Sequence, residues 1–245
     1  MISRRLVICA SLATLASTIE VDVNAASPRA LPESITIQTK GGLLVLQPLK
    51  HGSVLFKYKS KNYFVDPAQL PADMPLPLAD AIFITHEHGD HCDPATLKRI
   101  QKLSTVIIAN ANSAAILKSG IVLKNGDKRQ VLDVSVEAVP AYNIERPNFH
   151  PKGRDNGYVI TAGDKRIYFA GDTENTPEMR ALKNIDVAFL PINLPFTMPP
   201  KDAAAAARAF QPKMLIPYHQ GSSNPTEVQA ALKDTKIVVK VIALP

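Results

Sequence analysis

Cysteine and long apolar runs are both scarce in this sequence, and each shortage excludes a class of protein. Only two cysteines occur among 245 residues, Cys9 and Cys92. If the first 25 residues are removed, Cys92 stands alone and no internal disulfide can form. Residues 6–18 are uncharged but shorter than the roughly 20 residues that a membrane-spanning helix needs. The remaining chain must rely on its core, and on any bound metal, for stability.

Several functional signatures are also missing. The sequence has no internal repeat at a fixed period, no Gly-x-Ser-x-Gly motif and no P-loop, so a serine hydrolase or a P-loop nucleotidase is not indicated. The net charge of +6 favours small anionic substrates or surfaces. No dense Lys/Arg tract with interleaved aromatic residues occurs, and we therefore expect no nucleic-acid partner.

The N-terminus has the pattern of a secretory signal peptide. Arg4 and Arg5 form a short basic start, residues 6–18 are apolar or small, and residues 23–25 (VNA) offer a cleavage site. We expect cleavage after Ala25 and export of the remaining chain, to the periplasm or outside the cell. The mature chain is then expected to have no membrane span.

Two alternatives exist for this segment. It could be a buried helix or strand, which explains less well why charged and polar residues bracket the apolar run. It could also be a lipoprotein signal ending at Cys9, although the bulky Ile8 precedes that cysteine. Residues 26–245 are long enough to form one domain, and 46% of the residues of the chain are hydrophobic. We therefore expect a single domain with a substantial core.

Residue patterns predict many short strands and a few helices. Strands are expected at residues 34–38, 43–46, 53–58, 62–65, 81–85, 105–109, 130–132, 134–139, 158–161, 166–170, 187–190, 214–217 and 236–244. Helices are expected at residues 94–103, 113–118, 176–182, 201–210 and 226–232. Strands come first and later alternate with helices, which predicts an α/β fold of two sheets with helices outside.

Four side chains that can ligate a metal follow the apolar segment 81–85 within six positions: His86, His88, Asp90 and His91. Imidazole and carboxylate ligands suit zinc, and also iron or manganese when oxygen ligands are numerous. The alternative, a solvated polar loop, explains a single histidine better than three histidines and an aspartate directly after a buried strand. The cluster therefore predicts a metal site.

Three later residues extend this cluster. His150 and His219 lie in loops near predicted strand ends, and Asp172 follows the predicted strand 166–170. A carboxylate at such a point can bridge two cations, which is how a dinuclear site is closed.

The joint pattern resembles the metallo-β-lactamase superfamily, whose hallmark is H-x-H-x-D-H followed by a histidine, an aspartate and a last histidine. The resemblance implies an αβ/βα sandwich of two mixed sheets with helices on the outer faces. It also implies two divalent metal ions, zinc in the first place, with manganese or iron as alternatives. The first ion would be held by His86, His88 and His150, the second by Asp90, His91 and His219, and Asp172 would bridge them.

Five further segments resemble the branch that contains L-ascorbate-6-phosphate lactonase-like metal-dependent hydrolases. They are residues 64–67 (FVDP), 150–153 (HPKG), 157–160 (GYVI), 168–173 (YFAGDT) and 217–219 (PYH). True β-lactamases are less similar, because one class has a cysteine where Asp172 stands and others lack the bridging aspartate. Cys92 is not at that position, and we interpret it as a packing residue.

The resemblance implies a metal-dependent hydrolase in which a metal-bound hydroxide attacks an ester, lactone, amide or phosphodiester of a small molecule. Asp90 would hold the second metal and also steer the proton during catalysis. A non-catalytic, metal-stabilised binding protein is the alternative from another class. A di-iron redox enzyme of this fold is a third, and it typically has Glu where His88 stands.

Other residues near these motifs have two interpretations each. Asp66 either orients a metal-binding histidine or starts the turn before Pro67. Lys152 and Arg154 either grip an anionic substrate group or belong to a solvated loop. Tyr218 either contacts the substrate or packs in the core. For His51, a hydrogen bond in a loop or in the core is the interpretation favoured over metal ligation.

Overall fold

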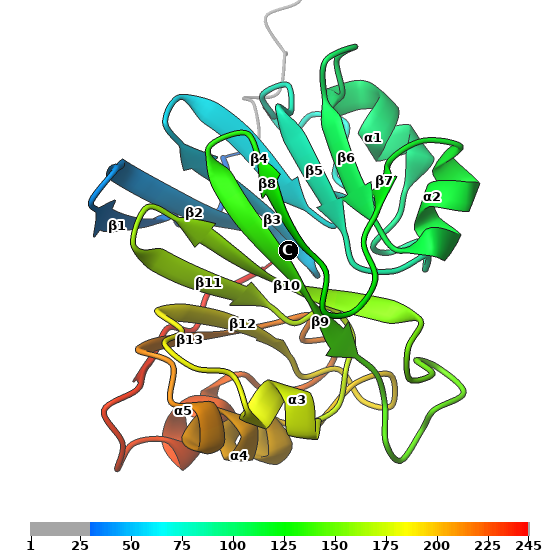
Figure 1. Cartoon of the computed structure of the whole chain (residues 1–245). Coiled ribbons are helices and arrows are strands. Elements are labelled where there is room, and N and C mark those ends of the chain that lie inside the picture. The colour runs from blue at the N-terminus through cyan, green and yellow to red at the C-terminus, as the bar shows by residue number, and fades with distance from the viewer. Residues whose placement is uncertain (1–29, 245) are drawn as a thin grey trace, which may run out of the picture.

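The computed structural model describes residues 30–244, and the predicted signal peptide at residues 1–25, with Cys9, lies outside them. Two seven-stranded sheets form its centre (Figure 1). The first sheet contains, in order, β1 (Ile35–Thr39), β2 (Gly42–Lys50), β3 (Ser53–Tyr58), β4 (Lys61–Val65), β5 (Ala81–Ile84), β6 (Val106–Ala109) and β7 (Ile121–Val122). The second contains β8 (Lys128–Val131), β9 (Val134–Ala141), β10 (Asp155–Ala162), β11 (Lys165–Phe169), β12 (Val187–Pro191), β13 (Met214–Tyr218) and β14 (Val238–Val239).

Helices cover the outer face of each sheet. The helices α1 (Pro94–Ile100) and α2 (Ala111–Leu117) lie beside the first sheet, and α3 (Pro177–Arg180), α4 (Pro200–Phe210) and α5 (Thr226–Ala231) beside the second (Figure 1). Each sheet is mixed, with antiparallel strands in its first half and parallel strands in its second. The predicted αβ/βα sandwich of two mixed sheets is therefore confirmed.

Apolar side chains from both sheets meet in a central core, where Phe56, Phe83, Phe169 and Phe189 are almost fully buried. Two further apolar clusters lie under the helices, one on each outer face. Burial on both faces explains why β5 and β12 are continuously apolar in sequence. None of the helices in residues 30–244 has the length and apolar character required to cross a bilayer.

The last strand is shorter than expected. The sequence predicts a strand over residues 236–244, but only Val238–Val239 pair with β13. The next residue of β13 that could pair with β14 is Pro217, which has no N–H to donate. Its carbonyl oxygen accepts a hydrogen bond from Gln220 Nε2 and not from β14. The ladder therefore ends there.

Candidate metal centre

The centre is built where strands of both sheets end. Asp66 follows β4, His86 comes two residues after β5, Asp172 comes three residues after β11, and His219 follows β13. Loops at strand ends are a common place for binding sites in α/β proteins, because rigid strands position them. The loop between β9 and β10 adds His150.

All six histidines of the chain gather at this one place. Ligand atoms of His86, His88 and His150 lie within 4.8 Å of one another and form the first donor set. The second donor set meets the same limit and consists of Asp90, His91, His219 and, in addition, His51. The structure thus brings together all seven side chains that the sequence singled out as metal ligands.

The carboxylate of Asp172 lies between the two donor sets. Its Oδ2 is 3.4 Å from His150 Nε2 and 4.0 Å from His86 Nε2. Its Oδ1 is 3.2 Å from both His91 Nε2 and His219 Nε2. Each set therefore faces a different oxygen of the same carboxylate, which is the arrangement that a bridging ligand requires.

The buried atoms at the middle of the centre fit a cation. His91 Nε2, His219 Nε2 and Asp172 Oδ1 are buried without a hydrogen-bond partner. Buried polar atoms are normally paired, because an unpaired one loses its hydration at a cost of about 1–3 kcal/mol. A metal ion coordinated by these nitrogen and oxygen atoms would satisfy all three, and such a donor set suits zinc.

Buried carboxylates orient the histidines. His91 Nδ1 lies 2.8 Å from Asp66 Oδ2, and Thr85 N donates to Asp66 Oδ1 at 2.8 Å. His150 Nδ1 lies 3.0 Å from Asp155 Oδ2. Each ring donates its Nδ1 proton to a carboxylate, so that Nε2, which faces Asp172, is the atom left to ligate a cation. The geometry therefore favours the orienting interpretation of Asp66 over the turn interpretation. It adds an equivalent partner, Asp155, whose role no sequence pattern indicated.

The donor sets differ in electrostatics. Burial, helped by His91, lowers the pKa of His86 well below its usual value, and burial and His150 lower the pKa of His88. Burial opposes protonation of His91 and His219 as well, but facing carboxylates together outweigh it and raise the pKa of both. They are Asp172 and Asp66 for His91, and Asp172 and Asp90 for His219. Burial would raise the pKa of Asp172, but the facing His219 and His91 lower it well below the usual range. Without a cation, the second set therefore retains protons more readily than His86 and His88 do.

The three residues considered for substrate binding already have partners. Lys152 forms an ion pair with Glu178 at 3.0 Å, and Arg154 pairs with Asp155 at 2.7 Å and with Glu87 at 3.2 Å. Tyr218 is 1% exposed, and its hydroxyl oxygen accepts a hydrogen bond from Gly171 N. The structure thus favours a packing role for Tyr218 and paired, structural cations at Lys152 and Arg154.

Cys92 and His51 are the two residues whose roles the sequence left most open. Cys92 is 4% exposed in the apolar cluster under α1, and burial raises the pKa of its thiol to about 11, which fits a packing residue. His51 Nε2 lies 3.0 Å from Asp90 Oδ2, so the expected hydrogen bond exists, but it is made inside the centre. The sequence could not place it there because 39 residues separate the partners.

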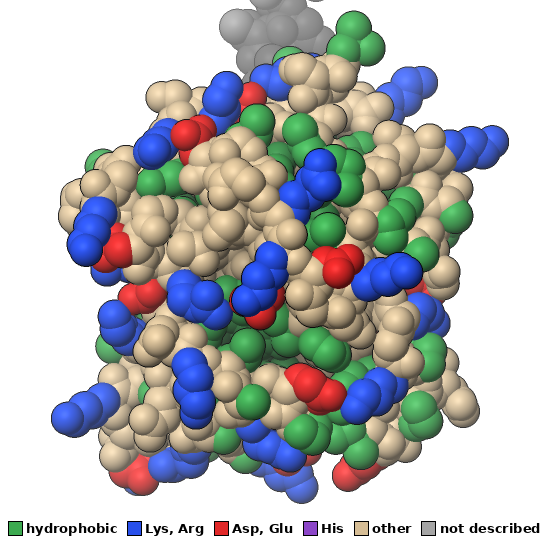
Figure 2. Space-filling view, in the orientation of Figure 1, with side chains coloured by type: hydrophobic (Ala, Val, Ile, Leu, Met, Phe, Trp, Pro, Cys, Tyr) green, Lys and Arg blue, Asp and Glu red, His purple; other side chains and the backbone are tan. Residues whose placement is uncertain are grey.

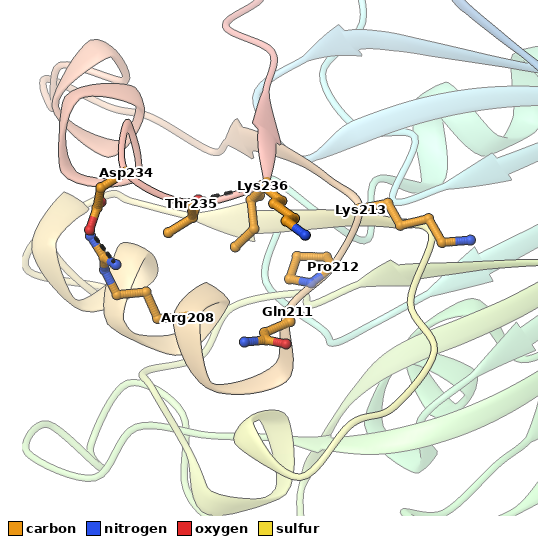
Figure 3. A pocket seen from close by; sticks show the side chains of 8 residues that line it. Arg208, Gln211, Pro212, Lys213, Asp234, Thr235 and Lys236 are labelled. Carbon is orange, nitrogen blue, oxygen red and sulfur yellow. Dashed lines mark hydrogen bonds and ion pairs between the residues drawn. The ribbon is translucent and has the colours of Figure 1, made fainter.

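Surface features away from the centre offer less chemistry. Figure 2 shows a face on which Lys and Arg side chains are scattered among acidic ones and no histidine is visible. A surface hollow of about 620 Å³ lies after α4, where Arg208, Lys213, Asp234 and Lys236 contribute to its lining (Figure 3). Arg208 is paired with Asp234 and Lys213 with Asp186, so these lining cations are already neutralised.

Comparisons with known proteins agree with this geometry. Residues 45–219 match the family described as the β-lactamase superfamily domain. A UPF0173 metal-dependent hydrolase from Listeria monocytogenes is 36% identical over 63% of this chain and 72% of that protein. A relative of the same description from Methanopyrus kandleri is 28% identical over 67% of this chain and 79% of that protein.

Solved structures show the same similarity. A crystal structure from Parabacteroides distasonis, described as that of a metal-dependent hydrolase, is 46% identical with a TM-score of 0.85, over 87% of this chain and all of that one. The metallo-β-lactamase fold protein YhfI from Bacillus subtilis is 16% identical with a TM-score of 0.65, over 79% of this chain and 88% of that one, and so supports the fold alone. The chain therefore belongs to the β-lactamase superfamily and, within it, to the UPF0173 metal-dependent hydrolases.

Proposed function

We propose that the centre binds two divalent cations, zinc in the first place and manganese or iron as alternatives, and hydrolyses a small molecule. His86, His88 and His150 would hold the first cation, and Asp90, His91 and His219 the second. The position of Asp172, with one oxygen toward each donor set, is the observation that carries the proposal.

When bound, the cations supply a water whose pKa is lowered to about 7, and thus a hydroxide at neutral pH. The protein contributes a rigid, largely buried set of donors that need not reorganise during the reaction. Only His88 and Asp90 among the seven are partly exposed, so the substrate would approach from their side. The Asp90 carboxylate, 37% exposed, would also steer the proton during the reaction.

The bond cleaved would be an ester, lactone, amide or phosphodiester, in agreement with the resemblance to lactonase-like hydrolases. Arg154 and Lys152 are already paired with carboxylates, so the proposed cations themselves would be the groups that attract an anionic part of the substrate. The net charge of +6 is compatible with such a substrate.

Metal analysis and a substrate panel test the proposal together. Protein purified without chelator is expected to contain two zinc ions per chain and to hydrolyse members of a panel of lactones, amides and phosphodiesters. Asp172→Ala should lose metal and activity, whereas Asp73→Asn, a change at an exposed carboxylate that is not a proposed ligand, should lose neither. Fewer than two metals per wild-type chain under metal-replete conditions would refute the dinuclear site.

A metal-stabilised binding protein without catalysis is the alternative. It predicts two bound metals, thermal stabilisation by zinc and no turnover on any member of the panel. The same purified protein distinguishes the two functions, because metal content and turnover are measured separately.

We also propose that the protein is exported, on the strength of the signal-peptide pattern at residues 1–25. Sequencing the N-terminus of the protein from the exported fraction should give a start near Ala26. A start at Met1 would contradict cleavage.

A further inference from the structure

The turn between β2 and β3 places a histidine inside the metal centre that the family motif does not include. His51 and Gly52 form this turn, with Lys50 paired to Ser53 across it. The φ angle of His51 is +50°, a conformation that Asn, Asp and His adopt more often than other non-glycine residues. The turn therefore accepts a histidine, and the contacts of its ring indicate what it does there.

The turn is fixed against the second donor set by three contacts. His219 N donates to the His51 carbonyl oxygen at 3.0 Å, and the rings of His51 and His219 lie with centroids 3.6 Å apart. A Cβ at Gly52 would lie 2.9 Å from Cε1 of His91, so only glycine allows this close approach. The His51 ring is thereby packed against the second donor set, and its Nε2 is directed at Asp90.

The Asp90 side chain has few contacts that could hold it in place. Asp90 lies in the loop after β5, its side chain is 37% exposed, and within residues 30–244 its carboxylate has a single hydrogen bond, to His51. The same oxygen, Oδ2, lies 3.5 Å from His219 Nε2 and 3.9 Å from His91 Nε2. The hydrogen bond thus holds the carboxylate at the distance at which all three groups can share one cation.

We propose that His51 is a positioning residue of the second metal site, whose Nε2–H holds the Asp90 carboxylate toward His91 and His219. This role rests on the two-cation function proposed above. Ligating carboxylates are themselves commonly hydrogen-bonded, and loss of such an outer partner typically weakens metal binding about 10–100-fold. His51 would do for Asp90 what Asp66 does for His91.

Two variants separate the hydrogen bond from the packing of the ring. His51→Phe retains an aromatic ring against His219 but has no donor, and His51→Gln retains an N–H at a similar reach. Both keep a side chain at the same positive φ, so backbone strain is matched between them. Zn²⁺ is titrated into the metal-free proteins in competition with a chromophoric chelator, and thermal unfolding of the same metal-free proteins is recorded.

We expect His51→Phe to weaken the second zinc-binding step about 10–100-fold and to leave the first step unchanged. His51→Gln should restore the second step to within a few-fold of the wild type. The step affected should be the one that Asp90→Ala abolishes, and His51→Phe should have no further effect in the Asp90→Ala background.

Other outcomes would overturn the proposal. Wild-type affinity in His51→Phe would show that the hydrogen bond does not matter, and equal weakness in both variants would indicate that His51 ligates the metal itself. Equal weakening of both steps with a lower unfolding temperature of the metal-free protein would indicate a general packing role. A wild type that binds fewer than two zinc ions would instead refute the proposed function before any His51 variant is compared.

Discussion

The two halves of the molecule have the same architecture but use it differently. Residues 35–122 form β1–β7 and residues 128–239 form β8–β14, and each half has three antiparallel pairings followed by three parallel ones. The turn after β2 carries His51 and the equivalent loop after β9 carries His150. The loop after β4 carries Asp66 and the equivalent loop after β11 carries Asp172.

The equivalent aspartates, Asp66 and Asp172, illustrate how the two halves differ in use. Both oxygens of Asp66 accept hydrogen bonds, from Thr85 N, Thr85 Oγ1 and His91 Nδ1, so its role is completed within the protein. Asp172 Oδ1, by contrast, is buried and has no hydrogen-bond partner. One half thus supplies an orienting carboxylate and the other a carboxylate free to ligate, from the same place in the topology.

Replacing each of these aspartates by asparagine should have different consequences and the largest effects. Asp172→Asn should remove bound metal and reduce activity more than about 100-fold, because even outer partners of a metal contribute 10–100-fold. Asp66→Asn should lower the free energy of unfolding by about 3–5 kcal/mol in the metal-free protein, because it breaks a fully buried pair. Denaturant unfolding and metal analysis of both proteins test this.

Equal loss of bound metal in the two variants would remove the distinction between an orienting and a ligating aspartate. Loss of metal in Asp66→Asn alone would reverse it.

Asp155 should show that the second half also orients its own histidine, with an intermediate effect. Asp155→Asn removes the charge that holds His150 Nδ1, and we expect zinc to bind the first donor set about 10–100-fold more weakly. Arg154→Gln is the matched control, since it removes the guanidinium beside Asp155 and leaves the bond to His150 intact. Zinc titrations of both variants give the measurement, and equal weakening would assign the effect to the ion pair.

The donor sets should also differ in pH dependence. A histidine must lose its proton to bind a metal. When the pH is lowered, metal binding to a histidine with a raised pKa therefore begins to weaken at a higher pH than binding to a histidine with a lowered pKa. The pKa is raised for both histidines of the second set, His91 and His219, whereas in the first set it is raised only for His150 and lowered for His86 and His88. Below the raised pKa values, zinc affinity of the second set should fall about tenfold per pH unit for each proton displaced.

Zinc content measured after equilibration at stepwise lower pH tests this. The protein should pass through a state with one zinc per chain before it loses the second ion. Simultaneous loss of both ions would contradict the electrostatic difference between the sets.

The sequence predicted the fold class and most elements because apolar periodicity and turn residues are local signals. It also indicated the proposed metal ligands, because the end of a strand and the chemistry of the side chain that follows it can be recognised within a short segment. It did not reveal the duplicated topology, because the two halves share strand order without a repeated motif. It predicted a long final strand because nothing local shows that the Pro217 carbonyl is already occupied by Gln220.

What the sequence determined by itself was which side chains could hold a metal, since His and Asp in the spacing from His86 to His91 have little other use at the end of a buried strand. What only the tertiary structure decided was which groups orient them. His51 meets Asp90 across 39 residues, and Tyr218, adjacent to His219, is turned into the core. A hydrogen bond requires a distance of about 3 Å between its two atoms. When the two atoms belong to segments far apart in the chain, only the packing of the sheets determines that distance.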